Sequence, residues 1–414
     1  MKKLIWMLLM ASLCSNLSAQ IQLEGRFDLD NPQNQLWDGR YLVYNFYKDV
    51  IIYDTQTETQ YKEIGQSLPD MSFKEGLYFR RVDGKYEMRR VGDPNPVLPQ
   101  RFLRITNWFG NTVLAWEQTA PNLEGMRAYW YELDKGVIAT YSLAQLYQAV
   151  DYDGTYTHDA MSIFQSKPWE SFIYFFHDGL ITLKHPTKGT FSYFDLKLNP
   201  AFPGKFRKAD PFFENLAAVQ NANGLWGFID KSGKEVIPFI YVKRPWPFHS
   251  GLARVESKEG YVGFINTQGE LVIPAKYAFA SNFHQGFSIA RKFGYPTSFV
   301  VIDTLGNEIP FPCSCEMDFR QYLKQNYGDY YSLNPVFDYV ESGYLVVTRK
   351  SQSAVFGKEG NQILPFKYAF ITDARKGKAI AIEWGELGSY KNLRFFLMDL
   401  ETQSPAIELS YTEF

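Results

Sequence analysis

The sequence predicts an all-β protein made of tandem β-meander units. Three observations support this fold class: a motif recurs at nearly constant spacing, turn-forming residues occupy the same place in each copy, and short runs rich in Val, Ile, Phe and Tyr flank those turns. The glycines Gly233, Gly269 and Gly306 lie 36 and 37 residues apart. A fixed period of roughly 20–50 residues is typical of solenoids, propellers and other repeat arrays.

Each copy has an apolar run, a tight turn and a second apolar run closed by proline. In the first copy Asp230 and Gly233 take the first and fourth positions of a predicted type I turn. The second copy predicts strands over 252–256, 261–266 and 270–273. One such unit cannot bury both of its faces, so neighbouring units must stack. The repeat positions, all interpreted as structural, are Trp226, Gly227, Asp230, Gly233, Pro238, Gly251, Gly263, Asn266, Gly269, Pro274, Gly286, Asp303, Gly306, Pro310, Gly360 and Pro365.

A second shared piece begins each unit. Gly251 and Gly286 stand at the same place in two copies, and Asn215 replaces glycine in the other. Asparagine is the residue that best tolerates a left-handed backbone after glycine, so this position is predicted to be a turn with positive φ. His249 and His284 share a slot two residues before these glycines, which favours a repeat-packing or surface role over a pair of ligands.

The run Trp226-Gly227-Phe228-Ile229-Asp230, with its downstream glycine and Val-Ile-Pro, resembles the WG-containing repeat of bacterial proteins. The resemblance covers residues 212–310 well and about 340–400 loosely. The motif departs to Val262-Gly263 and Val300-Val301 in the next two copies. The resemblance implies a tandem β-repeat protein, often exported, whose relatives mostly lack an assigned activity. It transfers no catalytic residue.

The array is predicted to close like a propeller, because closure leaves only short, protected strand edges. An open β-solenoid stays an alternative, since the repeat is shorter than a usual blade of about 40–45 residues. We expect about nine units, with diverged repeats preceding the clear ones. The predicted divisions are 1–19 signal peptide, 20–205 diverged β-repeats, 206–312 WG-like repeats, 313–333 an insertion with a short helix over 316–327, and 334–414 further WG-like repeats and a cap.

The first residues have the pattern of a secretory signal peptide. Lys2-Lys3 precede an apolar run, and Ala19 is a small residue at the predicted cleavage point. Bulky Leu13 before Cys14 disfavours a lipoprotein anchor. After the signal no run approaches 18 apolar residues, so no membrane span is expected. These features predict a periplasmic or extracellular protein.

Composition excludes some functions and leaves others open. The net charge of −2 is interspersed, which provides no broad basic face for nucleic acid. Cys313 and Cys315 are the only cysteines after the signal, so disulfides do not hold the fold together; a strained bridge or a soft-metal site is less favoured than two incidental thiols. Aromatic residues make up 17% of the chain, which favours packing between repeats over a sugar-stacking surface.

No motif in the chain assigns a chemical step, so the sequence predicts no catalytic residue, cofactor or metal ligand. A short helix is predicted over 142–150. Asp151–Asp159 resembles half of a calcium loop but lacks the third acidic ligand and a closing glutamate, which favours a solvated loop. The predicted function is an exported, non-enzymatic binding or scaffold protein for a protein, peptide or cell-envelope glycan. The alternative is a hydrolase or lyase whose active site is assembled from separate units.

Overall fold

The computed structural model describes residues 19–23, 35–37, 40–46, 49–66, 73–106, 108, 111–120, 124–152, 173–283, 286–293, 299–310, 344–349, 352–357, 361–371, 376–383 and 394–411. The chain divides into two compact units, Met1–Pro69 with Cys315–Phe414 (unit 1) and Asp70–Ser314 (unit 2). Several predictions concern residues outside the described ones: the signal peptide before Ala19, the calcium-like segment after Tyr152, His284, Cys313, Cys315, the insertion helix and Gly360. The domain boundaries drawn from the sequence stay a prediction.

The predicted all-β class is confirmed, because the described residues form 33 strands and one helix. The strands of unit 1 are β1 (Ala19–Leu23), β2 (Gln35–Trp37), β3 (Tyr41–Phe46), β4 (Asp49–Asp54), β5 (Thr59–Glu63), β27 (Tyr344–Arg349), β28 (Gln352–Gly357), β29 (Gln362–Tyr368), β30 (Phe370–Ile371), β31 (Lys378–Glu383), β32 (Arg394–Asp399) and β33 (Ser404–Tyr411). The elements of unit 2 are β6 (Phe73–Lys74), β7 (Leu77–Val82), β8 (Lys85–Arg90), β9 (Arg104–Ile105), β10 (Thr112–Gln118), β11 (Met126–Glu132), β12 (Gly136–Ser142), α2 (Leu143–Ala149), β13 (Ile173–His177), β14 (Leu180–Lys184), β15 (Phe191–Phe194), β16 (Lys208–Ala209), β17 (Leu216–Gln220), β18 (Trp226–Asp230), β19 (Glu235–Tyr241), β20 (Phe248–His249), β21 (Leu252–Glu256), β22 (Val262–Asn266), β23 (Leu271–Ala280), β24 (Phe287–Lys292), β25 (Phe299–Asp303) and β26 (Glu308–Pro310).

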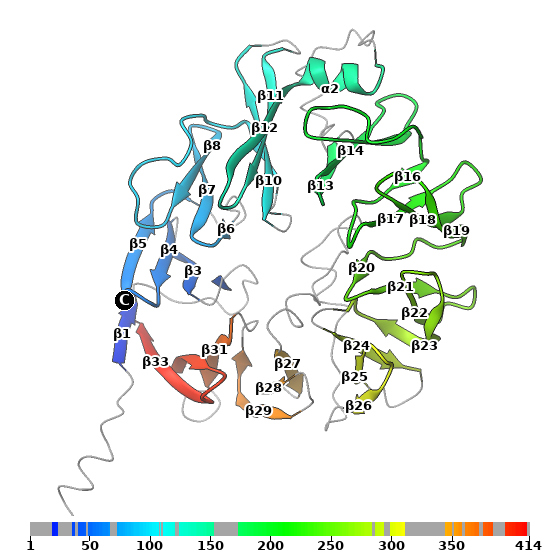
Figure 1. Ribbon diagram of the computed structural model, residues 1–414. Helices are drawn as coiled ribbons and strands as arrows, with labels where there is room; N and C mark the ends of the chain where they lie inside the picture. The colour runs from blue at the N-terminus through cyan, green and yellow to red at the C-terminus, as the bar shows by residue number, and fades with distance from the viewer. Residues whose placement is uncertain are drawn as a thin grey trace, which may run out of the picture. The chain divides into compact units, whose positions relative to one another are not determined.

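Unit 2 contains five antiparallel sheets that follow one another in chain order, namely β6–β8, β9–β12, β13–β15, β16–β19 and β20–β26 (Figure 1). A buried apolar cluster lies between each sheet and the next. Strand β17 shows how this works: Leu216 and Ala218 belong to the cluster shared with the following sheet, whereas Ala217 and Val219 belong to the cluster shared with the preceding one. Side chains alternate across a strand, so stacking on both sides buries both faces.

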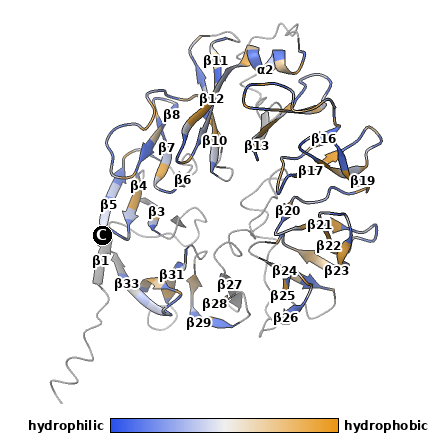
Figure 2. Ribbon diagram, in the orientation of Figure 1, coloured by the Kyte–Doolittle hydropathy of each residue, from blue (hydrophilic) through white to orange (hydrophobic). Residues whose placement is uncertain are grey.

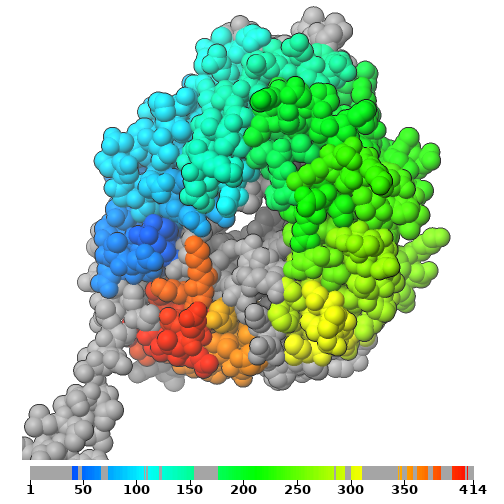
Figure 3. All heavy atoms as spheres, in the orientation of Figure 1, coloured from blue at the N-terminus to red at the C-terminus, as the bar shows by residue number. Residues whose placement is uncertain are grey.

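Buried residues therefore follow one another along inner strands such as β17 and β18, whereas the outer strand β19 alternates exposed residues with buried or half-buried ones. Figure 2 accordingly shows both apolar and polar stretches on the strands of unit 2. In the space-filling view the successive segments of unit 2, coloured from cyan to yellow, touch in chain order (Figure 3). The third strand of the second copy is longer than predicted. It starts at Leu271 and continues to Ala280, where it also pairs with β24 and so joins the second copy to the third in one sheet.

The predicted helix is confirmed as α2, which follows β12. Ser142 caps it: its side chain accepts a hydrogen bond from the Gln145 amide at 3.2 Å, and the Gln145 side chain accepts one from the Ser142 amide at 2.8 Å. This reciprocal capping box satisfies two amides that the helix leaves without partners. Leu146 and Tyr147 are buried in the cluster between the second and third sheets of unit 2.

Unit 1 contains three sheets, of which β2–β5 and β27–β29 are antiparallel meanders. The third has the order β1-β33-β32-β31-β30, and β1 pairs with β33 in parallel, from Ala19 opposite Ile407 to Leu23 opposite Tyr411. An early strand of the chain thus completes the sheet formed by its last strands. Val355, Leu364 and Phe396 belong to an apolar cluster shared by the β27–β29 sheet and this sheet.

The glycine of the WG motif lies opposite a bulge. Trp226 pairs with Tyr241 and Phe228 pairs with Ile237, so Gly227 alone lies opposite the three residues 238–240 of β19. The backbone of that bulge crosses so closely that a Cβ on Gly227 would lie 2.7 Å from the Ile237 carbonyl oxygen. In this copy the close approach therefore leaves no room for a Cβ.

The other copies vary this bulge. Gly263 repeats it opposite Pro274, because Val262 pairs with Tyr277 and Phe264 with Ile273. In the third copy Val300 pairs directly with Pro310, without a bulge, and a large side chain is tolerated. In the β27–β29 sheet the same register places Ala354 at this slot, opposite the bulge that contains Pro365.

Candidate functional site

One end of the sheets in unit 2 carries a series of equivalent two-residue turns. Their central residues are Asp178 and Gly179 (φ 53° and 84°), Glu214 and Asn215 (50° and 67°), and Ser250 and Gly251 (55° and 76°). Positive φ at both central positions defines a type I′ turn, whose twist matches that of the strands it joins. The positive φ predicted for the Asn215 and Gly251 slot is confirmed. Gly286, at 84°, continues the series.

Each of these turns is bonded to the next one along the chain. The Asn215 amide donates to Asp178 Oδ2 at 3.3 Å, and the Gly251 amide donates to Glu214 Oε2 at 2.9 Å. The Gly286 amide donates to Ser250 Oγ at 3.2 Å. The first central side chain of one turn thus satisfies the second amide of the following turn. We call residues 177–179, 213–215 and 249–251, with Gly286, the turn row.

Aromatic rings lie beside these bonds. The His177 ring stacks on Phe213, with centroids 4.2 Å apart and an interplanar angle of 26°, and Phe213 lies 5.0 Å from His249. His177 Nδ1 is 2.6 Å from the Phe212 carbonyl oxygen. Because a carbonyl only accepts, Nδ1 carries the hydrogen in this contact. All three rings are half-buried, so their outer edges reach solvent.

His177 and Phe213 stand directly before their turns, at the repeat position that His249 occupies and that the sequence assigned to His249 and His284. The signal was present but weak: His177-Asp178-Gly179 lies 72 residues, or two periods, before His249-Ser250-Gly251. The side chains of Asp178 and Glu214 add negative charge to the turn row. Lys231 Nζ lies 3.7 Å from Asp178 Oδ2 and neutralises part of it.

The predicted hairpin turns lie at the same end of the sheets as the turn row, because Leu216 pairs with Asp230 and Leu252 pairs with Asn266. Asp230 Oδ1 accepts from the Ser232 and Lys234 amides at 2.9 and 3.1 Å, and the Gly233 amide donates to the Asp230 carbonyl oxygen at 2.9 Å. Gly233, Gly269 and Gly306 have φ between 81° and 84°. Asn266 and Asp303 accept equivalent amide bonds in the next two copies.

We expect the hairpin turns that contain an aspartate to stabilise the fold less as the pH is lowered. Hydrogen bonds from the Ser232 side chain and from the Lys234 and Ser232 amides hold the pKa of Asp230 below its usual value of 3.8. A carboxyl with a depressed folded-state pKa stabilises the fold above its unfolded pKa, and the stabilisation is lost as pH falls through the folded pKa. Asp230→Asn should therefore lose less stability than the wild type between pH 5 and pH 2, measured as thermal midpoints by circular dichroism. Asn266→Asp, the reverse change, should lose more. Parallel pH profiles for all three proteins would contradict the assignment.

One position in the segment that leads into each repeat carries a buried charge in the first copy and none in the other two. In the first copy Asp210 is 6% exposed, and Arg244 Nε donates to its Oδ2 at 2.8 Å. Burial raises the pKa of Asp210, and the Arg244 charge opposes that rise. The Tyr193 hydroxyl donates to the Asp210 backbone oxygen at 2.5 Å. At the equivalent position of the second copy stands Trp246, and in the third Ser281.

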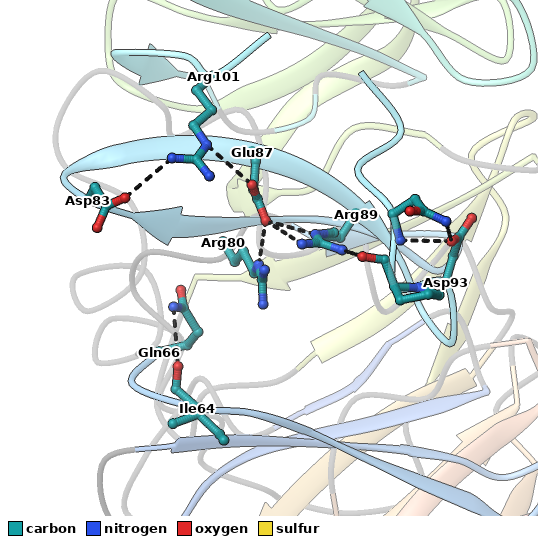
Figure 4. A network of polar contacts seen from close by, with 10 residues as sticks. Ile64, Gln66, Arg80, Asp83, Glu87, Arg89, Asp93 and Arg101 are labelled. Carbon is teal, nitrogen blue, oxygen red and sulfur yellow. Dashed lines mark hydrogen bonds and ion pairs between the residues drawn. The ribbon is translucent and has the colours of Figure 1, made fainter. Parts of the chain in front are cut away.

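A charged network occupies one face of the β6–β8 sheet (Figure 4). Glu87 is 4% exposed, and its Oε1 accepts from Arg80 Nε at 2.7 Å and from Arg89 Nε at 2.8 Å. Arg101 lies 3.5 Å from Glu87 Oε2 and 3.3 Å from Asp83. Burial raises the pKa of Glu87, but Arg80 and Arg89 lower that pKa by more. Glu87 occupies the centre, so its charge is paired within the cluster.

Within the described residues, no group of three or more His, Cys, Asp and Glu side chains is placed to hold a metal ion. Of the calcium-like segment, only Asp151 and Tyr152 are described, and Asp151 Oδ2 lies 3.9 Å from Lys205 Nζ. The one described helix is too short to cross a bilayer.

Comparison with known proteins confirms the resemblance to the WG-containing repeat in one part of the chain. Residues 191–226, 226–261 and 263–294 match the WG containing repeat. The match begins earlier than Phe212, and the structure explains why: Asp195 Oδ1 accepts from the Lys197 and Asn199 amides at 2.8 and 2.9 Å, as Asp230 does in its own turn. Leu198, with φ of 63°, stands in the position of Gly233, so this copy lacks the glycine that marks the others in the sequence.

No curated protein matches the chain at a significant level. Among solved structures, a eukaryotic initiation factor aligns at 10% identity over 89% of this chain and 95% of its own, with a TM-score of 0.47. BamB from Moraxella catarrhalis aligns at 10% identity over 66% and 88%, with a TM-score of 0.31. Hsv2p from Kluyveromyces lactis aligns at 8% identity over 79% and 97%, also with a TM-score of 0.31.

Proposed function

We propose that this WG-repeat protein is an exported, non-enzymatic binding or scaffold protein that holds a protein or peptide partner on its turn row. The observation that carries the proposal is the set of bonds from Asp178 to Asn215, from Glu214 to Gly251 and from Ser250 to Gly286. These bonds fix exposed positions of successive units in one register. Repeat proteins use such aligned positions as extended binding surfaces.

The side chains of the turn row favour a basic segment as the partner. Carboxylates of Asp178 and Glu214 alternate with the rings of His177, Phe213 and His249. A lysine or arginine side chain can lie against an aromatic face while its charge pairs with a neighbouring carboxylate. Each such contact is weak, and several in one register add up.

The test compares three baits of mature protein immobilised on beads and exposed to cell-envelope fractions. A His177→Ala/Phe213→Ala bait should lose the envelope proteins that the wild-type bait retains, as read by quantitative mass spectrometry. The matched control is Tyr261→Ala/Phe293→Ala, which removes two rings that are 40% and 56% exposed and lie 4.8 Å apart at another surface. Equal retention by all three baits, or no retention by the wild type, would reject the turn row as the binding surface.

Export and closure complete the proposal. Cleavage before Gln20 is expected, and intact-mass measurement of the secreted protein tests it.

We also propose that the repeats close radially. What supports this is the pairing of β1 with β33, which brings an early strand into the last sheet. Removal of residues 20–23 should then lower the thermal midpoint, because the β33 edge loses its partner. An unchanged midpoint would favour the open array.

A further inference from the structure

Arg254 stands where the neighbouring units have small or apolar side chains. The Trp246 amide bonds to the Arg254 carbonyl oxygen, as the Asp210 amide does to Ala218 and the Ser281 amide to Ile289. The three residues Ala218, Arg254 and Ile289 are therefore equivalent, and they are 1%, 8% and 4% exposed. A long cation has replaced an apolar side chain at a buried position of one unit.

The Arg254 guanidinium lies against aromatic rings. Its central carbon is 3.9 Å from the centroid of Trp246 and 5.7 Å from that of Phe279, and both rings are half-buried. Cation–π attraction offsets part of the cost of burying the charge. Nη1 also donates a hydrogen bond to the Ala280 carbonyl oxygen. Arginine has five N–H donors, so this contact uses a minority of them.

No carboxylate of the described residues lies within ion-pair distance of Arg254. Glu256, whose charge acts on Arg254, pairs with Lys243 instead. The first copy differs, because there the buried charge of Asp210 has Arg244 at 2.8 Å. Burial lowers the pKa of Arg254 to about 9, which still leaves the side chain charged at neutral pH. A buried, unpaired charge is costly, so it is a group that gains from an external counter-ion.

Asn282 provides a second, independent observation in the same junction. It lies two residues after Ala280, it is 3% exposed, and neither its amide nitrogen nor its amide oxygen has a partner among the described residues. Buried side-chain amides are nearly always hydrogen-bonded in native proteins. The unsatisfied amide of Asn282 thus lies two residues from the residue whose carbonyl oxygen accepts from Arg254.

We propose that Arg254, assisted by Asn282, binds the carboxylate of a peptide at the junction of the second and third WG-like units. A carboxylate accepts two parallel N–H bonds from a guanidinium fork, which is the strongest pairing that Arg254 can make. The half-buried Trp246 and Phe279 rings would contact an apolar group next to that carboxylate. This site is separate from the turn row and does not depend on the function proposed for it.

The test uses calorimetric titration of the full mature protein with three peptides. Acetyl-Ala-Ala-Phe with a free carboxylate should bind at least ten times more tightly than the same peptide with a C-terminal amide. Acetyl-Ala-Glu-Ala amide distinguishes the source: tighter binding of this peptide assigns the site to an acidic side chain, and weaker binding assigns it to a chain end. Either result supports a carboxylate site. Equal binding of acid and amide, or no binding of any peptide, overturns it.

Variants then locate the binding. Arg254→Met should abolish acid binding, and Arg254→Lys, which keeps the charge but loses the fork, should weaken it at least fivefold. Arg207→Met removes an exposed arginine of the preceding unit and should leave binding unchanged. Circular dichroism verifies that each variant is folded, and the acid–amide comparison on the wild type stands even if Arg254→Met does not fold. Unchanged acid binding to Arg254→Lys would also reject the proposal.

Discussion

Replacing Gly263 with alanine should destabilise the protein by about 3 kcal/mol, the upper part of the range for an overpacked core. A Cβ at this position would lie 2.6 Å from the Ile273 carbonyl oxygen, 2.7 Å from the Ala275 nitrogen and 2.9 Å from the Ala275 Cα. All three are backbone atoms, which cannot rotate away as a side chain can. Relief requires the bulge to move, and the bulge is fixed by pairs on both sides, Val262 with Tyr277 and Phe264 with Ile273.

Two further glycine variants separate this clash from the general cost of replacing glycine. Gly227→Ala should cost slightly less than Gly263→Ala, because its nearest backbone atoms lie at 2.7, 3.0 and 3.1 Å. Gly251→Ala meets no atom within 4 Å, and its φ of 76° costs only about 1–2 kcal/mol for a left-handed alanine. Urea midpoints followed by circular dichroism rank the three. If Gly251→Ala is as damaging as Gly263→Ala, the close approach of the bulge does not set the cost of replacing Gly263.

The same bulge explains how far the motif could be predicted from the sequence. The turns at Asp230, Asn266 and Asp303 were predictable, because their geometry depends on residues within four positions of one another. The clash that excludes a Cβ at Gly227 was not predictable, since the sequence does not reveal which backbone crosses it. The change to Val300 looked like divergence of the motif. It is instead the regular pairing of Val300 with Pro310, where no bulge presses on the strand.

The candidate site was less predictable, because it depends on contacts between units. Asn215 and Gly251 were recognised as turn residues, but nothing local indicates that Glu214 bonds the amide of Gly251, 37 positions away. His177 was not assigned to the same slot, because Leu198 stands in place of the hairpin glycine of its repeat. The roles of charged residues outside the motif were not predictable for a similar reason. Arg244 lies in the connection after β19 and donates to Asp210, which directly follows β16.

Arg244→Met tests that last contact and should cost about 3 kcal/mol at pH 7, the lower end of the range for breaking a buried ion pair. The lower end applies because the Arg244 side chain is 41% exposed, whereas that of Asp210 is 8% exposed. Without Arg244, the Asp210 carboxylate keeps its full desolvation penalty. The double variant Asp210→Asn/Arg244→Met should recover much of the loss, since no buried charge remains.

The pH dependence gives this prediction its sign. Burial already raises the pKa of Asp210, and Arg244 is the group that opposes the rise, so the pKa of Asp210 rises further in Arg244→Met. A carboxyl with a raised folded-state pKa binds more protons in the native than in the unfolded state, so stability falls as pH rises through the folded pKa. The deficit of Arg244→Met relative to the wild type should therefore shrink as pH is lowered from 7 to 4.5, in urea midpoints measured at each pH. The double variant lacks this titration, so its difference from the wild type should change less between pH 7 and pH 4.5 than the deficit of Arg244→Met does. A deficit of Arg244→Met that is independent of pH would mean that Arg244 stabilises the junction by packing of its aliphatic stem and not by its charge.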